Sequence, residues 1–488
     1  MRTGMKGLLS LFCGAAFLAG PPLLSGAGLP YPVVDTGQTR CFGDRGPIPC
    51  PAPGEPLSGQ DAQFEGAQPS YKDLGDGVVE DEVTGLEWVQ ARGPLVSWQE
   101  AMDGAKDCWV GGHRDWRLPG VKALVSLIDY RGRSGDSAGD SVPYLDTHFF
   151  GFAFGDTASG ARLIDAQDWS STPDLSPTMG GDRSVFGVNF IDGRVKSYPR
   201  WDRRSGEPKK LHARYVRGNP AYGRNDFEPR KDGTVLDKAT GLDWARDDSG
   251  RGMDWPQALA FAREADARRY LGHDDWRLPD AKELQTLVDY RRAPDVTDSP
   301  AIDPLFHCTA ITDEAGRKDW PWYWTSTTHL DNLGAVYVCF GRAMGFVRPP
   351  DGGRGSWLDV HGAGAVRSDP KTGSASRWPQ GRGPQGDAVR VDNYVRLVRG
   401  GGVKAVEGQQ HPAPLAGRSP ARPSMAPWQP SGRGSRPEAF QKPPEEAIHA
   451  CQGRQPGDLV TLTTPRGDLV DCRCQEKQGL LFAVPLNR

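Results

Sequence analysis

Residues 194–217 carry an unusual concentration of positive charge. They hold nine lysines and arginines against two acidic residues, Asp202 and Glu207, a difference of +7. Planar guanidinium groups suit sulfate or phosphate, and interleaved aromatic faces suit sugar rings and cations. The ligand-binding residues predicted here are Arg194, Lys196, Arg200, Trp201, Arg203, Arg204, Lys209, Lys210 and Arg214. The segment therefore predicts a site for an anionic polysaccharide, and the alternative interpretation is a solvated loop with no partner.

Other kinds of chemistry find little support in the sequence. It contains no nucleophile–base constellation, phosphate-binding loop or zinc-ligand spacing, so no catalytic residue and no metal ligand is assigned. Calcium is possible, because acidic residues are plentiful, but their spacing does not indicate a calcium site. The prediction is a protein without a cofactor and without catalytic activity.

An internal repeat organises the chain. The sequence Gly-His-Arg-Asp-Trp-Arg-Leu-Pro at residues 112–119 recurs as Gly-His-Asp-Asp-Trp-Arg-Leu-Pro at residues 272–279. Blocks before and after it recur in the same order, which indicates a duplicated module. The residues predicted to form the structural motif of each copy are Trp88, Trp116, Arg117 and Trp169 in the first and Trp244, Trp276, Arg277 and Trp324 in the second. Each copy is expected to close around its own tryptophan-centred interior.

Residues 319–324 of the second copy hold a cluster of aromatic side chains. Trp324 matches Trp169 of the first copy, whereas Trp320 and Trp322 have no counterpart there. Large aromatic side chains serve either as buried anchors or as platforms for a ligand. Trp320 and Trp322 are therefore candidates for lining a groove, with packing in the core as the alternative.

Each copy is predicted to be α+β and rich in loops. Ser97 and Glu100 form a capping box that begins a helix, and Asp254 caps the equivalent helix of the second copy. A second helix is expected after each Trp-Arg-Leu-Pro sequence, where leucines follow at helical spacing. Residues 185–198 alternate in polarity around a turn at Gly193, which predicts a hairpin.

The ends of the chain differ in composition from the copies. Two basic residues, an apolar run and small residues at the N-terminus predict a Sec-type signal peptide, and hence a periplasmic or extracellular location, with no transmembrane segment after its removal. The predicted boundaries are 1–27 for the signal peptide, 28–68 for an N-terminal leader, 69–219 and 225–400 for the two copies, 401–445 for a linker and 446–488 for a small C-terminal segment that contains cysteines. The linker is rich in Pro, Gly and Arg and is expected to be disordered.

The cysteines fit an oxidising compartment. Eight remain after removal of the signal peptide, and an even number favours disulfides. Cys41 and Cys50 flank a short loop and are expected to form a bridge, and Cys308 and Cys339 could form another within the second copy. Cys451 and Cys474 are further candidates, although the sequence leaves the connectivity open.

Charge and composition narrow the function. The net charge of −3 over 488 residues does not favour binding of nucleic acid by the whole molecule. The fifteen tryptophans are many for a chain with only 37% apolar residues. Such tryptophans serve as buried anchors or as stacking platforms for sugars.

The repeated motif, preceded in each copy by Thr-Gly-Leu-x-Trp, resembles the Lcl C-terminal domain family, also known as DUF1566. The resemblance covers two tandem copies at residues 69–218 and 225–400. It implies an exported bacterial protein and a fold similar to C-type lectins and formylglycine-generating enzymes. The collagen-like adhesin that gives the family its name is associated with sulfated glycans and surface attachment. The tail resembles a small secreted cysteine motif, to which Cys451 and Cys474 correspond.

Together these observations predict an exported, non-catalytic binding protein with tandem C-type-lectin-like modules that bind sulfated or other anionic glycans at the cell surface. One alternative is a structural or protein-interaction protein of the cell envelope. A further alternative is an enzyme related to the formylglycine-generating enzymes, which need a redox-active cysteine pair.

Overall fold

The computed structural model describes residues 28–203, 205–349, 353–406, 445–463, 469–477 and 480–485. The predicted signal peptide and most of the predicted linker lie outside the described residues. The chain forms two compact units, which divide between Ala413 and Pro414. Among the described residues, no helix has the length and apolar character needed to cross a lipid bilayer.

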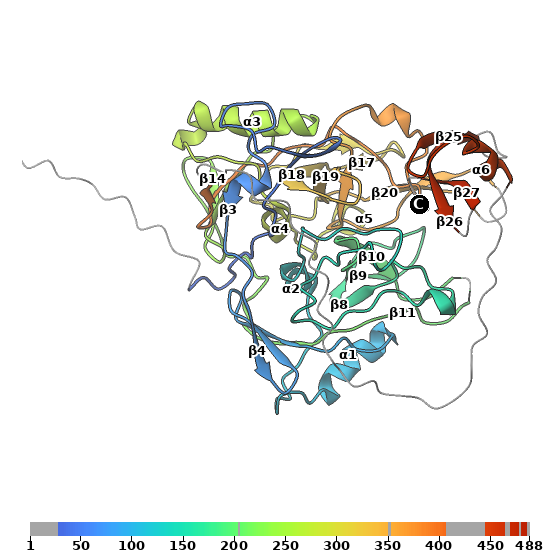
Figure 1. Ribbon diagram of the computed structural model, residues 1–488. Helices are drawn as coiled ribbons and strands as arrows, with labels where there is room; N and C mark the ends of the chain where they lie inside the picture. The colour runs from blue at the N-terminus through green and yellow to red at the C-terminus, as the bar shows by residue number, and fades with distance from the viewer. Residues whose placement is uncertain are drawn as a thin grey trace, which may run out of the picture. The chain divides into compact units, whose positions relative to one another are not determined.

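The first unit contains both copies and is a mixed α/β structure with many short strands and few helices (Figure 1). Copy one is residues 69–219 and copy two is residues 225–400. The helices of this unit are α1 (Trp98–Asp107), α2 (Val121–Ser126), α3 (Trp255–Ala267), α4 (Ala281–Thr286) and α5 (Pro294–Thr297). Helices α1 and α3 lie at opposite ends of the unit, and α2 and α4 lie together at its centre (Figure 1). The expectation of mixed helices and strands is confirmed.

The predicted helix caps are present at the first helix of each copy. The Ser97 hydroxyl accepts a hydrogen bond from the backbone N–H of Glu100, and the Glu100 carboxylate accepts one from the N–H of Ser97. Asp254 and Gln257 make the same reciprocal pair at the start of α3. Each cap satisfies backbone donors that the helix leaves open and contributes about 1 kcal/mol.

Each copy opens with a small antiparallel sheet that is closed by the copy's last strand. In copy one the strands are β4 (Tyr71–Gly75), β5 (Val78–Asp81), β6 (Leu86–Val89) and β12 (Val216–Gly218). In copy two they are β13 (Phe227–Pro229), β14 (Thr234–Asp237), β15 (Leu242–Ala245) and β23 (Val398–Gly400). The closing strand pairs beside the same strand in both sheets, with Val216 opposite Trp88 and Val398 opposite Trp244. The duplication seen in the sequence is thus a duplication of topology.

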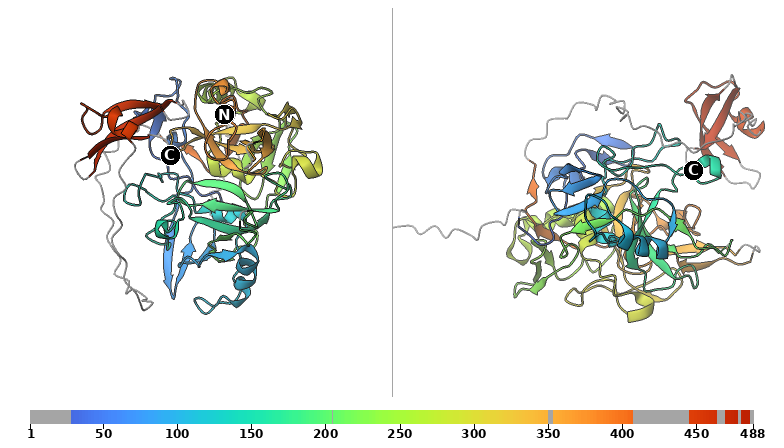
Figure 2. Two further views of the ribbon diagram at one scale, coloured as in Figure 1. Left: turned by 90° about the vertical axis from the view of Figure 1, so that its right-hand side faces the viewer. Right: turned by 90° about the horizontal axis from the view of Figure 1, so that it is seen from below.

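One six-stranded antiparallel sheet runs through both copies. Its strands in spatial order are β18 (Trp322–Thr328), β19 (Ala335–Cys339), β22 (Val366–Asp369), β10 (Arg194–Pro199), β9 (Ser184–Asn189) and β8 (Gln167–Pro173). The two halves meet where Val195 of β10 pairs with Val366 of β22. Figure 2 shows the green strands of copy one against the yellow and orange strands of copy two. Pairing at this junction satisfies backbone groups that would otherwise form exposed sheet edges.

The expectation that each copy has its own interior holds only in part. One apolar cluster contains residues of both copies, including Trp88, Leu124 and Val188 of copy one and Trp244 and Leu284 of copy two. Smaller clusters remain within each copy, one around Trp169 and one around Trp324. The sheet junction and the contact between α2 and α4 bring the two apolar surfaces together, so the largest cluster is buried jointly by both copies.

The repeated tryptophans are buried, as the interpretation of them as core residues requires. Trp88, Trp169, Trp244 and Trp324 have no exposed surface, and Trp116 and Trp276 are 5% and 4% exposed. The indole N–H of Trp169 donates to the carbonyl of Val96 and that of Trp324 to the carbonyl of Met253. A buried indole with a backbone acceptor combines large apolar burial with a satisfied donor.

Two equivalent lysines hold the copies together by reciprocal hydrogen bonds. The ammonium group of Lys122 donates to the carbonyl of Thr286, the last residue of α4, at 2.7 Å. The ammonium group of Lys282 donates to the carbonyl of Ser126, the last residue of α2, at 2.9 Å. Burial lowers the pKa of both lysines, that of Lys122 to about 8. Each helix therefore ends at a cation supplied by the other copy.

The leader also contacts both copies. Gln38 donates through its side-chain amide to the carbonyl of Tyr130 in copy one and to the carbonyl of Thr328 in copy two. The leader contains β1 (Cys41–Gly43), β2 (Gly46–Ile48) and β3 (Phe64–Glu65). The expected disulfide between Cys41 and Cys50 is present.

The predicted linker begins too early. Residues 404 and 405 form β24 (Lys404–Ala405), which pairs antiparallel with β3 of the leader. The composition of residues 401–406 resembles the linker, but backbone pairing with the leader orders them. The first part of the predicted linker therefore belongs to the folded first unit.

A buried polar cluster lies where the copies meet. Nε2 of His361 lies 2.6 Å from Oδ1 of Asp387, and Arg367 contacts both residues. Asp192 of copy one pairs with Arg194 and Lys196 beside this group. Burial, reinforced by the charge of Arg367, lowers the pKa of His361 to about 3. The imidazole is therefore neutral in the folded protein.

The second unit is small. It contains α6 (Glu445–Ala450) and a three-stranded sheet of β25 (Leu459–Thr463), β26 (Leu469–Lys477) and β27 (Leu480–Pro485). A disulfide joins Cys451 to Cys474. Both cysteines are buried in the unit's apolar cluster, where the bridge supplements a core of few residues.

Because the core is shared, loss of either lysine contact is expected to destabilise the whole first unit. Lys282→Met leaves the buried carbonyls of Ser126 and Asp35 without this donor, which costs about 1–3 kcal/mol. We expect the first unit to unfold in urea in a single transition, shifted to lower urea both in this variant and in Lys122→Met. The exposed Lys231→Met serves as control, with a change within about 0.5 kcal/mol. Two separate transitions within the first unit, only one of which responds to Lys122→Met, would contradict the shared core.

His361 is expected to make stability fall with acidity. The unfolded histidine binds a proton below about pH 6.5, whereas the folded one does so only near pH 3, so the stabilising contribution is complete above pH 6.5 and is lost as the pH falls toward 3. We expect His361→Gln to reduce the slope of unfolding free energy against pH between 6.5 and 4 by up to about 1.4 kcal/mol per pH unit. Chemical denaturation at several pH values measures this slope. The matched control is His307→Gln, whose side chain is 60% exposed, and an unchanged slope in His361→Gln would argue against a neutral buried imidazole.

Candidate functional site

The basic segment at residues 194–217 does not form one exposed face. Arg194 and Lys196 point into the interface between the copies, where both pair with Asp192, and their side chains are only 20% and 16% exposed. Burial lowers the pKa of Lys196 to about 8. Arg194 and Lys196 were predicted to bind ligand, and the structure assigns them instead to the interface.

Arg214 is also not available to a ligand. It is 1% exposed, and its guanidinium donates to the carbonyls of Val89, Gln90 and Gly151. Arg396 makes the equivalent contacts in copy two, with the carbonyls of Ala245, Arg246 and His307. The prediction that Arg214 binds ligand is therefore wrong, because a buried guanidinium needs fixed acceptors and here finds them on the backbone.

The middle of the segment forms an exposed hairpin, residues 199–211, here called the basic hairpin. Trp201 bridges Pro208 across it, and the N–H of Lys209 donates to the carbonyl of Arg200. Its base is fixed by β11 (Lys210–Leu211), which pairs with β7 (Val96–Ser97) before α1. Residue 204 lies outside the described residues. Of the predicted ligand residues, the hairpin thus holds Arg200, Trp201, Arg203, Lys209 and Lys210.

The side chains of the basic hairpin combine an exposed indole with cations. Trp201 is 57% exposed, Arg203 is 56% exposed and Lys210 is exposed. The guanidinium of Arg200 lies over the ring of Trp98, 4.4 Å from its centroid. Arg203 also pairs with Asp182 at 2.7 Å. The arrangement offers an aromatic face flanked by positive charge, which suits an anionic sugar chain.

Trp322 does not line a groove, whereas Trp320 lines the pocket of copy two that is described below. They are 6% and 1% exposed. The ring of Trp322 lies between the guanidinium of Arg390, at 3.8 Å, and the parallel ring of Tyr337, at 4.7 Å. Its indole N–H donates to the carbonyl of Arg342. For Trp322 the prediction of a groove is wrong and packing in the core is the correct interpretation, while Trp320 is largely buried and also lines a pocket.

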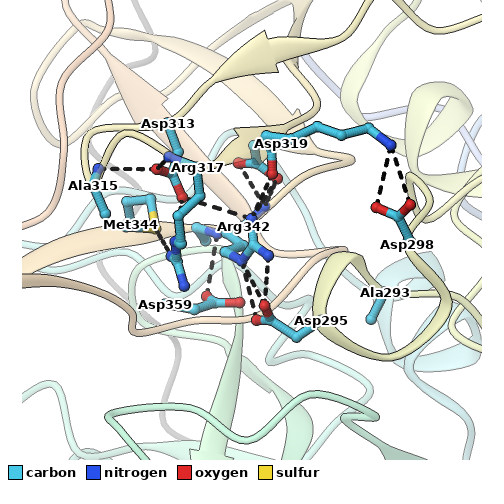
Figure 3. Close-up of polar contacts among 12 residues, drawn as sticks. Ala293, Asp295, Asp298, Asp313, Ala315, Arg317, Asp319, Arg342, Met344 and Asp359 are labelled. Carbon is cyan, nitrogen blue, oxygen red and sulfur yellow. Dashed lines mark hydrogen bonds and ion pairs between the residues drawn. The ribbon is translucent and has the colours of Figure 1, made fainter.

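A network around Arg342 holds this part of copy two together (Figure 3). Its guanidinium bonds to Asp295 and lies 3.5 Å from Asp319, while the backbone N–H of Arg342 donates to Asp319. Asp319 ends β17 (Lys318–Asp319), which pairs with β16 (Ile311–Thr312). Burial raises the pKa of Asp319 to about 6 and that of Asp359 to about 7. These charged groups have a structural role, because the guanidinium of Arg342 is paired with the carboxylates around it.

Copy two contains a pocket of about 350 Å³. Its lining residues are Arg292, Pro300, Ile302, Asp303, Pro304, Phe306, His307, Cys308 and Trp320. The guanidinium of Arg396 lies 3.4 Å from Sγ of Cys308. Arg214 bonds the carbonyl of Gly151 as Arg396 bonds that of His307, so Cys308 occupies the place of Phe152.

The predicted disulfide between Cys308 and Cys339 is not formed, and both residues are free thiols. Cys339 belongs to the apolar cluster of copy two, and Cys308 packs against the shared cluster. The two thiols therefore face different cores. The disulfide was predicted because both cysteines belong to copy two and lie close together along the chain. In the structure they lie on opposite faces of the six-stranded sheet.

No group of three or more metal-ligating side chains is found in the part of the chain that the structure describes. The acidic side chains described above are paired with arginines or with backbone donors. This pairing indicates that these acidic side chains have a structural role.

The two copies define a tandem-repeat protein whose halves share one core. A family model for the Lcl C-terminal domain matches residues 77–217 and 233–357, which are 141 and 125 residues, or 266 of 488. The chain therefore belongs to the Lcl C-terminal domain family, with two tandem copies, as its motifs predicted. Comparison with curated proteins gave no match, and neither did comparison with solved structures.

One partly exposed hairpin of copy two was not predicted from the sequence. Copy two carries an additional hairpin of β20 (Met344–Val347) and β21 (Ser356–Asp359) between β19 and β22. Copy one has only the turn at Asp192 and Gly193 in this place. Unequal spacing was the available signal: Trp169 to Val216 is 47 residues, whereas Trp324 to Val398 is 74.

We expect Cys308 and Cys339 to react as thiols. Alkylation of the non-reduced protein in denaturant, followed by peptide mass mapping, should modify both residues fully, because neither has a partner sulfur. Cys41 and Cys50 are the internal control and should react only after reduction. Recovery of a peptide pair linked through Cys308 and Cys339 would show that the structure has the pairing wrong.

Proposed function

We propose that this chain is an exported, non-catalytic binding protein that holds sulfated or otherwise anionic glycans on the basic hairpin of copy one. The observation that carries the proposal is the exposed ring of Trp201 among cations on a paired backbone. The signal-peptide pattern supports export, and the family resemblance supports a lectin-like fold for the copies. Both are part of the proposal.

The physical basis is a surface formed before the ligand arrives. The hairpin is held by its own backbone bonds and by the pairing of Lys210 with Ser97, so little conformational entropy is lost on binding. Arg200 is held in place over Trp98 rather than free in solvent. Sulfate groups meet guanidinium and ammonium donors while a sugar ring stacks on the indole of Trp201. Such binding weakens as salt screens the charges.

Heparin is the probe for this proposal. The variant Arg203→Gln/Lys209→Gln/Lys210→Gln removes three cations of the hairpin. Each exposed ion pair contributes about 0.2–1 kcal/mol, so binding should weaken by roughly 3- to 150-fold. Titration calorimetry or a heparin column at graded salt measures the change.

The matched control is Lys72→Gln/Lys231→Gln/Arg269→Gln. It removes the same charge from exposed sites elsewhere, and Arg269 is ion-paired and 65% exposed, much as Arg203 is. This control should bind heparin as the wild type does. Equal losses of heparin affinity in both triple variants would show that binding depends on the net charge of the protein and not on the basic hairpin. Wild-type protein that fails to bind heparin would refute the proposal.

A second pair of variants separates stacking from charge. Trp201→Ala should weaken heparin binding but leave binding of inorganic polyphosphate, which has no ring, unchanged. Trp109→Ala is the control, because Trp109 is 60% exposed at another place on copy one.

A further inference from the structure

The additional hairpin of copy two carries its own exposed cations and aromatic rings. We define this inserted hairpin as residues 344–349 and 353–359, which contain β20 and β21. Arg348 and Arg354 are exposed. Phe346 and Trp357 are half-buried beside them, with ring centroids 5.4 Å apart. Like the basic hairpin of copy one, the inserted hairpin combines exposed cations with aromatic side chains.

The inserted hairpin is fixed firmly to the body of copy two. Asp359 accepts a hydrogen bond from the N–H of Ala343, and Ala343 follows Arg342 of the ion network in Figure 3. The N–H of Phe346 donates to the carbonyl of Gly386. Buried contacts at its base therefore fix the orientation of the inserted hairpin relative to the body of copy two. Its cations are carried on this fixed backbone.

A single turn of copy one joins the two hairpins. This turn, residues 178–182, is closed by the bridge between Thr178 and Asp182. On one side the N–H of Met179 donates to the carbonyl of Asp359 of the inserted hairpin, at 2.8 Å. On the other side Asp182 pairs with Arg203 of the basic hairpin, at 2.7 Å. Five residues span at most about 18 Å, so the base of the inserted hairpin and Arg203 of the basic hairpin flank the same short turn.

The turn continues the positive charge between the hairpins. Arg183 is exposed directly after it, and its carbonyl accepts the N–H of Arg200. The carboxylate of Asp182, which would repel an anion, is paired with Arg203. The cations of the basic hairpin and Arg183 therefore lie on one side of the turn, and on its other side begins the inserted hairpin, which carries Arg348 and Arg354 beyond its paired strands.

We propose that the anionic glycan binds along a path from the basic hairpin past this turn to the inserted hairpin and contacts both copies, with Arg348 and Arg354 of the inserted hairpin forming the second half of the site. The inference rests on the proposed function and extends it to a chain long enough to reach both hairpins. A ligand that engages two linked subsites gains affinity from the second contact without a second diffusional encounter. Short fragments occupy one hairpin and gain nothing from the other.

The test uses the full chain with heparin fragments of graded length, measured by titration calorimetry. Arg348→Gln/Arg354→Gln should weaken long fragments by roughly 2- to 30-fold. It should not change the affinity of fragments that are too short to span both hairpins, because these fragments bind the basic hairpin of copy one. The wild type should show a step in affinity at the length that reaches both hairpins, and this variant should lose the step.

The controls separate the two hypotheses. Lys72→Gln/Lys231→Gln should keep the step in affinity. If the triple variant of the basic hairpin loses binding while Arg348→Gln/Arg354→Gln binds long fragments as the wild type does, the two-copy path is overturned and the proposed function stands. If the wild type binds no heparin of any length, both fail together. Circular dichroism of each variant confirms folding, which surface substitutions at these exposed arginines are expected to preserve.

Discussion

A buried ammonium group is tolerated only where acceptors are fixed around it, and the centre of this protein contains two such groups. Lys122 and Lys282 each reach the last carbonyl of a helix in the other copy, where the helix dipole favours a cation. The contacts need the two copies in one relative position. That position in turn aligns β10 with β22 and merges the apolar surfaces into one core.

The shared core decides which basic residues remain for a ligand. β10 lies at the junction, so Arg194 and Lys196 turn toward Asp192 and the other copy. After β10 the chain leaves the sheet and forms the basic hairpin, where Trp201 is exposed. It then returns to the core, where Arg214 binds carbonyls. One stretch of sequence with uniform composition therefore has a buried start, an exposed middle and a buried end.

The elements that could be predicted from the sequence are those set by local contacts. The capping box at Ser97 and the hairpin around Gly193 follow from neighbouring residues. At Gly193 φ is +60°, and a Cβ atom would lie 2.4 Å from the ring of Tyr144, so glycine is required there. The shared core could not be predicted, because apolar periodicity identifies a buried face but not the surface that covers it. The free thiols were missed for the same reason, since closeness in sequence does not show which core Cys308 and Cys339 face.

Comparison of the copies distinguishes the two classes of residue. Arg214 and Arg396 stand four positions before the glycine that ends each copy and do the same work, binding three carbonyls each. When both copies hold the same charged residue at equivalent positions, a structural role in the fold explains it more simply than ligand binding does. Trp201 and Arg348 instead lie on hairpins that the copies do not share. The duplicated residues build the common core, and the differences between the copies lie on the surface, where the basic hairpin and the inserted hairpin meet at one turn.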